Sequence, residues 1–103
     1  MAKLITVYWR DIPSQVMVRV GRETTKVMLS QRFQEAIDRA AMRAGKGSSD
    51  LYLAEWHRTT GSCSGDPQTA ANSEARRLEA AYDDARLESL VKSKGEDLTA
   101  REA

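Results

Sequence analysis

An amphipathic helix predicted from Ser30 to Ala44 constrains the fold of this chain more than any other stretch. Its apolar residues follow the spacing i, i+3, i+4, i+7, i+8 and i+11, so they share one stripe of an α-helix. Ser30 is a suitable N-cap, and Gly45 can end the helix in the left-handed conformation. The stripe must be buried, and the strand-like sequence before it is the expected partner. Its members are Phe33, Ala36, Ile37, Ala40, Ala41 and Ala44.

Two stretches before this helix are typical of strands. Residues 3–9 are rich in β-branched and aromatic side chains, and residues 15–20 alternate between two faces. Pro13 and its neighbours form a turn between them, which predicts an antiparallel hairpin. Residues 26–29 form either a short third strand or an extended lead into the helix. The alternating strand places Val16, Val18 and Val20 on one face and Met17 and Arg19 on the other.

The segment Leu51–His57 has two possible structures. A short helix is favoured, because Ser49 and Asp50 lie where a helix would be capped. A strand would instead place Tyr52 and Trp56 on one face together with Ala54.

The remainder of the chain is more polar. Residues 59–73 contain mostly Gly, Ser, Thr, Asn, Gln and Pro, and we expect a flexible linker there because so little apolar surface can be buried. Residues 74–103 are predicted to be an acidic helical tail, with Leu78, Tyr82 and Ala85 on one face. The predicted class is α+β: a small antiparallel sheet of two to three strands packed against the central amphipathic helix, plus this tail. Residues 1–58 would form the compact α+β domain.

The charge of the chain is nearly balanced but unevenly placed. The 103 residues carry a net charge of +1, with ten cations and six anions up to Thr60 and an excess of three anions after it. This balance excludes a strongly basic nucleic-acid-binding protein. Cys63 is the single cysteine, so no internal disulfide can form and a reducing compartment is expected. The apolar run at residues 4–9 is too short to cross a membrane, and we expect a cytoplasmic protein.

No motif indicates catalysis, a metal site or a cofactor. His57 and Cys63 lack the spacing and the additional ligands of a zinc site. Gly45 and Gly47 lack the third glycine and the preceding strand of a phosphate-binding loop.

Two groups of residues could instead bind a protein partner. The first is the turn that contains Tyr8, Trp9, Arg10 and Asp11, although Trp9 could equally be a core residue. The second is a row on the central helix about 240° to 280° around the axis from Phe33. An apolar Met42 lies opposite the stripe, although this face could equally be solvated. The row consists of Arg32, Arg39 and Arg43.

Three motifs together resemble a known family. They are the stretch from Tyr8 to Pro13 followed by Gln15 and Val16, the helix from Arg32 to Met42, and Tyr52-Leu53 with Trp56. The chain resembles a small bacterial family of virulence factor proteins and is similar to the C-terminal domain of conserved virulence factor C. The resemblance covers about residues 3–58 and not the tail.

The resemblance has implications for function. The resemblance implies that, in longer relatives, this module ends a chain that also carries an iron–sulfur-scaffold-like domain and HEAT-type repeats. As a stand-alone copy, this chain looks like those of alphaproteobacteria. The genes for such copies often lie near corrinoid and folate methyl-transfer genes. The resemblance implies no catalytic residues, and Tyr52 and Trp56 complete the candidate partner-binding set. We expect a non-enzymatic accessory protein that binds a protein partner. The alternatives are an accessory factor in corrinoid- or folate-dependent methyl transfer or cofactor assembly, and a weak nucleic-acid binder.

Overall fold

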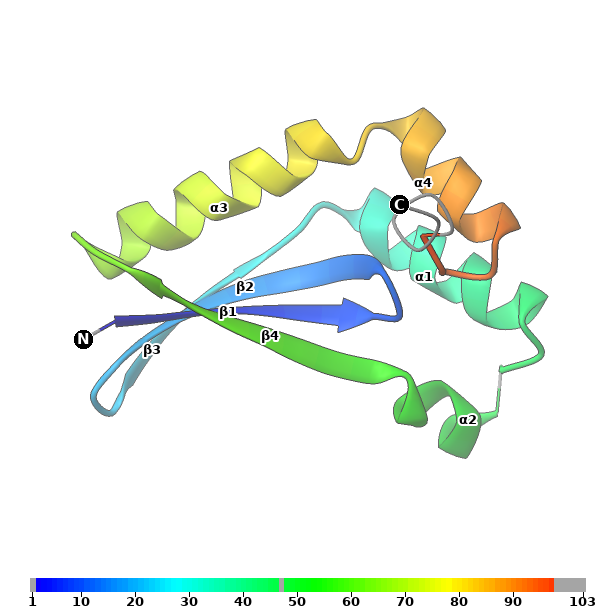
Figure 1. Ribbon diagram of the computed structural model, residues 1–103, viewed down its shortest axis with the longest axis horizontal. Coiled ribbons are helices and arrows are strands. Elements are labelled where there is room, and N and C mark those ends of the chain that lie inside the picture. Colours follow the sequence, from blue (N-terminus) through cyan, green and yellow to red (C-terminus); the bar gives the residue numbers. More distant parts are fainter. Residues whose placement is uncertain (1, 47, 98–103) are drawn as a thin grey trace.

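A four-stranded antiparallel sheet forms one layer of the molecule (Figure 1). The computed structural model describes residues 2–46 and 48–97. The strand order is β3-β2-β1-β4, so the last strand along the chain returns to pair with the first. The prediction of two to three strands was therefore one strand short. The strands are β1 (Ala2–Trp9), β2 (Ile12–Val20), β3 (Glu23–Met28) and β4 (Trp56–Cys63).

The first three strands follow each other through tight turns. The first two form the antiparallel hairpin that the sequence predicted. Arg10 and Asp11 connect β1 to β2, and Arg10 adopts a positive φ of 52°. A register shift between Val7 and Tyr8 lets β2 carry one extra residue at this end. Gly21, at φ 59°, allows the second turn. The stretch around Lys26 is a true third strand and not only a lead into the helix.

The central helix forms where its sequence predicts, although the Ser30 side chain makes no capping hydrogen bond to the first turn. The helices are α1 (Gln31–Arg43), α2 (Ser49–Ala54), α3 (Pro67–Ala81) and α4 (Asp84–Lys92). Ser30 and Ala44 flank α1, and five residues of its apolar stripe are buried. After the helix, Gly45 has a φ of 71°, and the Lys46 amide donates to the Ala41 carbonyl oxygen at 2.8 Å. This pattern satisfies carbonyl groups that the helix end would otherwise leave open.

The main cover of the sheet is α3 and not α1. Figure 1 shows α3 running along one side of the sheet, where it contacts β2 and β3. By contrast, α1 packs mainly against α4 and more lightly against β2. The prediction that α1 would cover the sheet was incomplete, because it assigned no packing role to the residues that form α3.

The predicted flexible linker at residues 59–73 is wrong. Its first part belongs to β4, which pairs with β1 from Trp56 to Cys63 although most of its side chains are exposed. Main-chain hydrogen bonds stabilise this strand. Its sequence therefore has few of the apolar side chains from which a strand is usually predicted. The second part begins α3, where the Asp66 side chain accepts from the Thr69 amide at 3.0 Å and Pro67 occupies the first turn.

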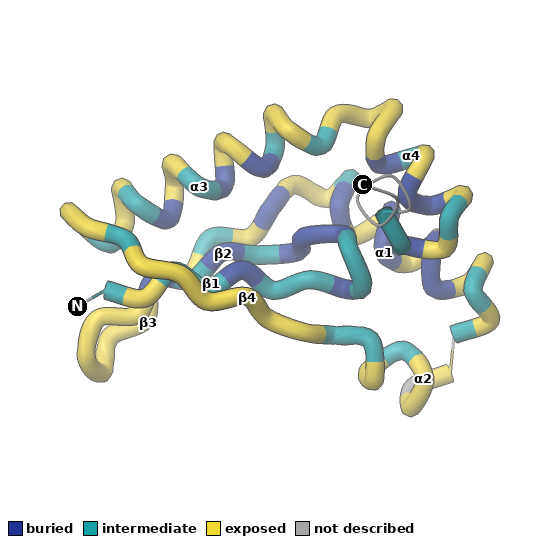
Figure 2. Tube along the Cα trace, viewed as in Figure 1, coloured by how far each residue is buried: buried dark blue, intermediate teal, exposed yellow. Residues whose placement is uncertain are grey.

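The predicted tail is part of the core. One cluster of buried residues joins Trp9 and Val16 of the sheet to Leu78 of α3 and Leu90 of α4 (Figure 2). The compact unit therefore extends far beyond residue 58. The predicted alternatives for Leu51–His57 both occur, since α2 ends at Ala54 and β4 begins at Trp56. Among the residues described, no helix has the length and apolar character needed to cross a membrane.

Candidate functional site

The aromatic residues of the predicted binding set pack on one another. Trp9 is fully buried, and its indole nitrogen donates to the Tyr52 carbonyl oxygen at 2.9 Å. The Tyr52 ring stacks on Trp9 at 5.9 Å between centroids and meets the edge of Trp56 at 5.8 Å. These contacts fasten α2 to the end of the sheet. Trp9 is thus a core residue, which was the alternative interpretation of the turn.

The turn residues Arg10 and Asp11 bind residues 94–97 of the same chain. The Arg10 guanidinium donates to the Lys94 carbonyl oxygen at 2.9 Å, and the Asp11 amide donates to the Gly95 carbonyl oxygen at 2.8 Å. The Asp97 amide donates to the Asp11 carboxylate at 2.6 Å. The surface expected to receive a partner is therefore occupied by residues 94–97 of the same molecule.

Tyr8 lies on the helix-covered side of the sheet. Its ring stacks on His57 at 5.4 Å between centroids. Burial raises the pKa of the Tyr8 hydroxyl, and the nearby Glu74 carboxylate raises it further. The protonated phenol is thus the stable form, which gives this residue no feature of a general base.

Arg32 joins α1 to the end of α3. Its guanidinium contacts the Glu79 carboxylate at 2.9 Å and donates to the Glu79 carbonyl oxygen at 2.7 Å. The same carboxylate accepts from the Ser30 amide at 2.6 Å and from the Ser30 hydroxyl at 2.8 Å. Burial opposes ionisation of Glu79, but these hydrogen bonds from Ser30 and Arg32 outweigh it and lower the pKa. Glu79 therefore caps α1 from a distant part of the chain.

Arg39 and Arg43 differ in their surroundings. Arg39 forms a two-pronged ion pair with Glu88 of α4, at 2.8 and 3.1 Å. Arg43 is exposed, as is Met42, whose exposed fraction is 74%. Two of the three arginines in the predicted row thus hold the tail helices against α1, and the third faces solvent.

The side of the sheet opposite α3 is not covered by any described helix along most of its length (Figure 1). Cross-strand partners in an antiparallel sheet point to the same side, so the register assigns the side chains of this face. They form three rows, which we call the open face. In the order β3, β2, β1, β4 the rows are Thr24, Arg19, Lys3 and Ser62; Lys26, Met17, Ile5 and Thr60; and Met28, Gln15, Val7 and Arg58.

The open face has an apolar centre and a basic border. Ile5, Val7 and Met17 are half-buried in the middle of it, whereas Val16 and Val18 on the other side of β2 are fully buried. Exposed cations surround the centre, and none of the residues in the three rows is acidic. Among the residues described, none of these cations forms an ion pair. The cations are Lys3, Arg19, Lys26 and Arg58.

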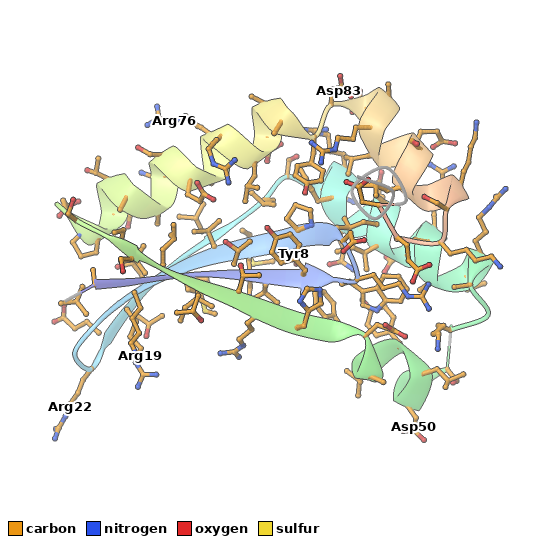
Figure 3. All side chains as sticks on the ribbon, viewed as in Figure 1. Tyr8, Arg19, Arg22, Asp50, Arg76 and Asp83 are labelled. Atoms are coloured by element: carbon orange, nitrogen blue, oxygen red, sulfur yellow. The ribbon has the colours of Figure 1, made fainter. Side chains whose placement is uncertain are left out.

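A groove of about 430 Å³ lies at one end of the open face. Val7 and Arg58 line it from the sheet, and Trp56 lines it where β4 begins. Leu53 of α2 forms another wall and is 63% exposed. Figure 3 shows Arg19 pointing away from α3, on the opposite side of the sheet from Arg76. The groove and the cations thus share one side.

Sequence reasoning missed the open face for a specific reason. The alternation of β2 placed Met17 and Arg19 together on a second face, which was the available signal. The assignment of residues 59–73 to a linker removed Thr60 and Ser62 from the sheet, and with them the column that completes this face.

No group of three His, Cys, Asp or Glu side chains in the described ranges could hold a metal ion. His57 and Cys63 lie six residues apart on the same strand, at about 20 Å by the rise of a strand, which is too far for a nucleophile and its base.

Comparison with known proteins identifies the family. A family model described as "Virulence factor" matches residues 7–91. The match includes β4, α3 and most of α4, so the expectation that the resemblance ends near residue 58 was wrong. No curated protein and no solved structure matches in the comparisons. The chain belongs to the virulence factor family.

Proposed function

We propose that this chain is a non-enzymatic accessory protein that binds a protein partner through the open face. The observation that carries the proposal is an uncovered sheet face whose apolar centre is ringed by cations. Ile5, Val7 and Met17 leave apolar area in water that a partner would cover, and the removal of such area from water favours association. Among the described residues, the side chains of its three rows make none of the ion pairs that join the elements of the fold, so binding to them would not require refolding.

The residues expected from the sequence to bind a partner contribute less to this proposal. Trp9, Arg10 and Arg32 have internal partners, and binding through them would break contacts of the folded chain. Trp56 is the member of the predicted set that lines the groove of the open face, and we retain it as a partner-binding residue.

A weak interaction with nucleic acid is the second candidate function. The four cations of the open face favour it, since phosphates bind to such surfaces through their charge. Trp56 lines the groove at one end, but none of the residues in the three rows is aromatic, whereas sheets that bind single strands stack bases on aromatic rings along the sheet. The protein partner is therefore the better-supported function.

Affinity capture from the organism of origin with matched charge variants tests the proposal. The double variant Arg19→Glu/Arg58→Glu reverses two charges of the open face, and Arg76→Glu reverses one on the exposed side of α3. We expect the wild-type chain and Arg76→Glu to capture the same partner in near-stoichiometric amounts and the double variant to lose it. Circular dichroism verifies that all three chains are folded.

Two results would contradict the proposal. One is the absence of a stoichiometric protein with the wild-type chain, and the other is equal capture by the double variant. Retention on immobilised DNA that falls steeply with salt, without a protein partner, would favour the nucleic-acid function. A captured corrinoid- or folate-dependent enzyme would place the accessory role in methyl transfer.

A further inference from the structure

We infer that the occupant of the open face is an acidic amphipathic helix of the partner, which inserts a bulky apolar side chain into the groove beside Trp56. This inference rests on the proposed function and specifies the partner's chemistry. It is drawn from the charge, the dimensions and the shape of the open face.

The charge of the face selects an acidic occupant. Lys3, Arg19, Lys26 and Arg58 surround the apolar centre, and they lack ion pairs within the described parts of the chain. Carboxylates at the border of a bound helix would pair with them while its apolar stripe covers Ile5. Each such pair adds little alone, but four cations together disfavour a basic competitor.

The dimensions of the face suit one helix. Strands about 4.8 Å apart and residues about 6.8 Å apart along one face give a platform roughly 14 Å on each side between Cα atoms. A helix with its side chains is about 10–12 Å wide, so two to three turns would cover it. The other side of the same sheet shows the arrangement, since α3 lies across β2 and β3 there. An extended strand would instead pair along an edge of the sheet.

The groove gives the occupant an anchor position. Leu53, Trp56 and Val7 supply apolar walls, and Arg58 stands beside them. Its volume of about 430 Å³ is larger than one side chain requires, so a Phe, Trp or Leu would enter readily. Apolar anchors in such pockets dominate the affinity of small interfaces.

A second copy of this chain does not fit the same face. Two open faces packed together would bring eight cations into one interface without a carboxylate between them, and like charges at close range oppose association.

Selection from a displayed library of random helical peptides tests the inference directly. The full chain is immobilised, and the library contains acidic, neutral and basic sequences in equal number. We expect the enriched peptides to carry net negative charge, an apolar stripe at helical spacing and one bulky side chain near an end. In binding measurements with the enriched peptide, Arg19→Glu and Arg58→Glu should each weaken affinity about fivefold, and Arg76→Glu should leave it unchanged.

A second variant separates the groove from the charges. Leu53→Glu places a carboxylate at the exposed wall of the groove and should weaken the enriched peptide at least as much as Arg58→Glu. NMR amide shifts on peptide addition should centre on Ile5, Val7 and Met17.

Several outcomes would overturn the inference. They are the enrichment of basic or uncharged peptides, the lack of any enrichment, and amide shifts that map to the helices. Tight binding of a single-stranded oligonucleotide to the same face, or self-association that persists at low salt, would replace the helix with another occupant. If the captured protein of the proposed function still depends on Arg19 and Arg58 while acidic peptides fail, the surface is correct and only the assigned chemistry is wrong.

Discussion

Gly95 lies against the ring of Trp9, where a side chain has no room. Its φ of 86° is strained for any residue with a Cβ, and a Cβ there would stand 2.9 Å from Cζ3 of the buried indole. Gly95→Ala should therefore lower the free energy of unfolding by about 2–4 kcal/mol, the sum of backbone strain and overpacking. Urea denaturation followed by tryptophan fluorescence measures the loss.

Gly21→Ala provides the matched control at another positive φ. Gly21 has a φ of 59°, and nothing lies within 4 Å of its added Cβ, so only the backbone strain of about 1 kcal/mol should appear. Equal losses for the two variants would show that residues 94–97 do not press on Trp9 in solution, and the interpretation of the turn as a receptor for this segment would fail.

Glu79 makes stability depend on pH. Its pKa is lower in the folded chain than in the unfolded chain, because hydrogen bonds from Ser30 and Arg32 outweigh the effect of burial. The stabilisation is complete above the unfolded pKa of about 4.3 and is lost as the pH falls through the lower folded value. Glu79→Gln should lower the free energy of unfolding by about 1 kcal/mol at pH 7 and by less at pH 3.

Urea denaturation at intervals from pH 7 to pH 3 measures this dependence. Glu23→Gln is the control, because Glu23 is exposed and its side chain makes no hydrogen bond or ion pair within the described ranges. A loss of stability in Glu79→Gln that is the same at both pH values would show that the carboxylate does not act through its charge.

At the scale of elements, α3 is the main cover of the sheet, which is the role that the sequence suggested for α1. Leu78 of α3 is 2% exposed and belongs to the same buried cluster as Phe33 of α1. Leu78→Ala should lower the free energy of unfolding by about 2–4 kcal/mol, since it removes buried methyl groups and leaves a cavity. Leu53→Ala, at an exposed position of α2, should change it by less than about 0.5 kcal/mol.

Thermal and urea unfolding of the two leucine variants distinguish a core helix from a loosely attached tail. A small loss for Leu78→Ala, comparable to that for Leu53→Ala, would mean that α3 contributes little to the stability of the fold. The comparison uses one residue type and one kind of truncation, so side-chain chemistry does not confound it.

Elements with strong local signals could be predicted from sequence, and elements stabilised by distant partners could not. The apolar stripe of α1 and the Gly45 stop are local, and both are found where expected. β4 has exposed threonines because it lies at an edge, so its place in the sheet depends on pairing with β1. The start of α3 did have a signal, since Asp66 and Pro67 are a typical cap and first residue, but the polar composition around them obscured it.

The candidate site followed the same rule. Tyr8, Trp9, Arg10 and Asp11 were chosen as residue types that often bind partners, and their neighbours in space decided their roles. A sequence does not show that the Lys94–Asp97 segment returns to this turn. The open face required the pairing of all four strands, including the one that read as a linker.

At the scale of the whole molecule, the uneven charge of the sequence is divided between two sides. The acidic second part pairs with two of the three arginines of α1, through Glu79 with Arg32 and Glu88 with Arg39. The cations of the open face receive no such partner from the residues that the structure describes. The chain thus uses its acidic helices to complete its own core and leaves the basic side of the sheet exposed, which is why we assign binding to that side.

This division predicts that the first part of the chain cannot fold alone. A fragment of residues 1–63 contains the whole sheet and α1 but lacks the buried side chains of the last two helices. Four of those are leucine or valine, and at about 1.5–3 kcal/mol each their loss is similar in size to the total stability of a small domain. The missing side chains are Ala71, Ala75, Leu78, Leu87, Leu90 and Val91.

We therefore expect fragment 1–63 to show poor amide dispersion by NMR and no cooperative unfolding transition. Addition of a second fragment, residues 64–103, should restore both, because the apolar stripe of α1 and the helix side of β2 would again be covered. The full chain serves as the reference spectrum. Cooperative unfolding of fragment 1–63 alone would instead show that the sheet and α1 bury enough apolar surface for independent stability, and that the last two helices are an addition to a finished domain.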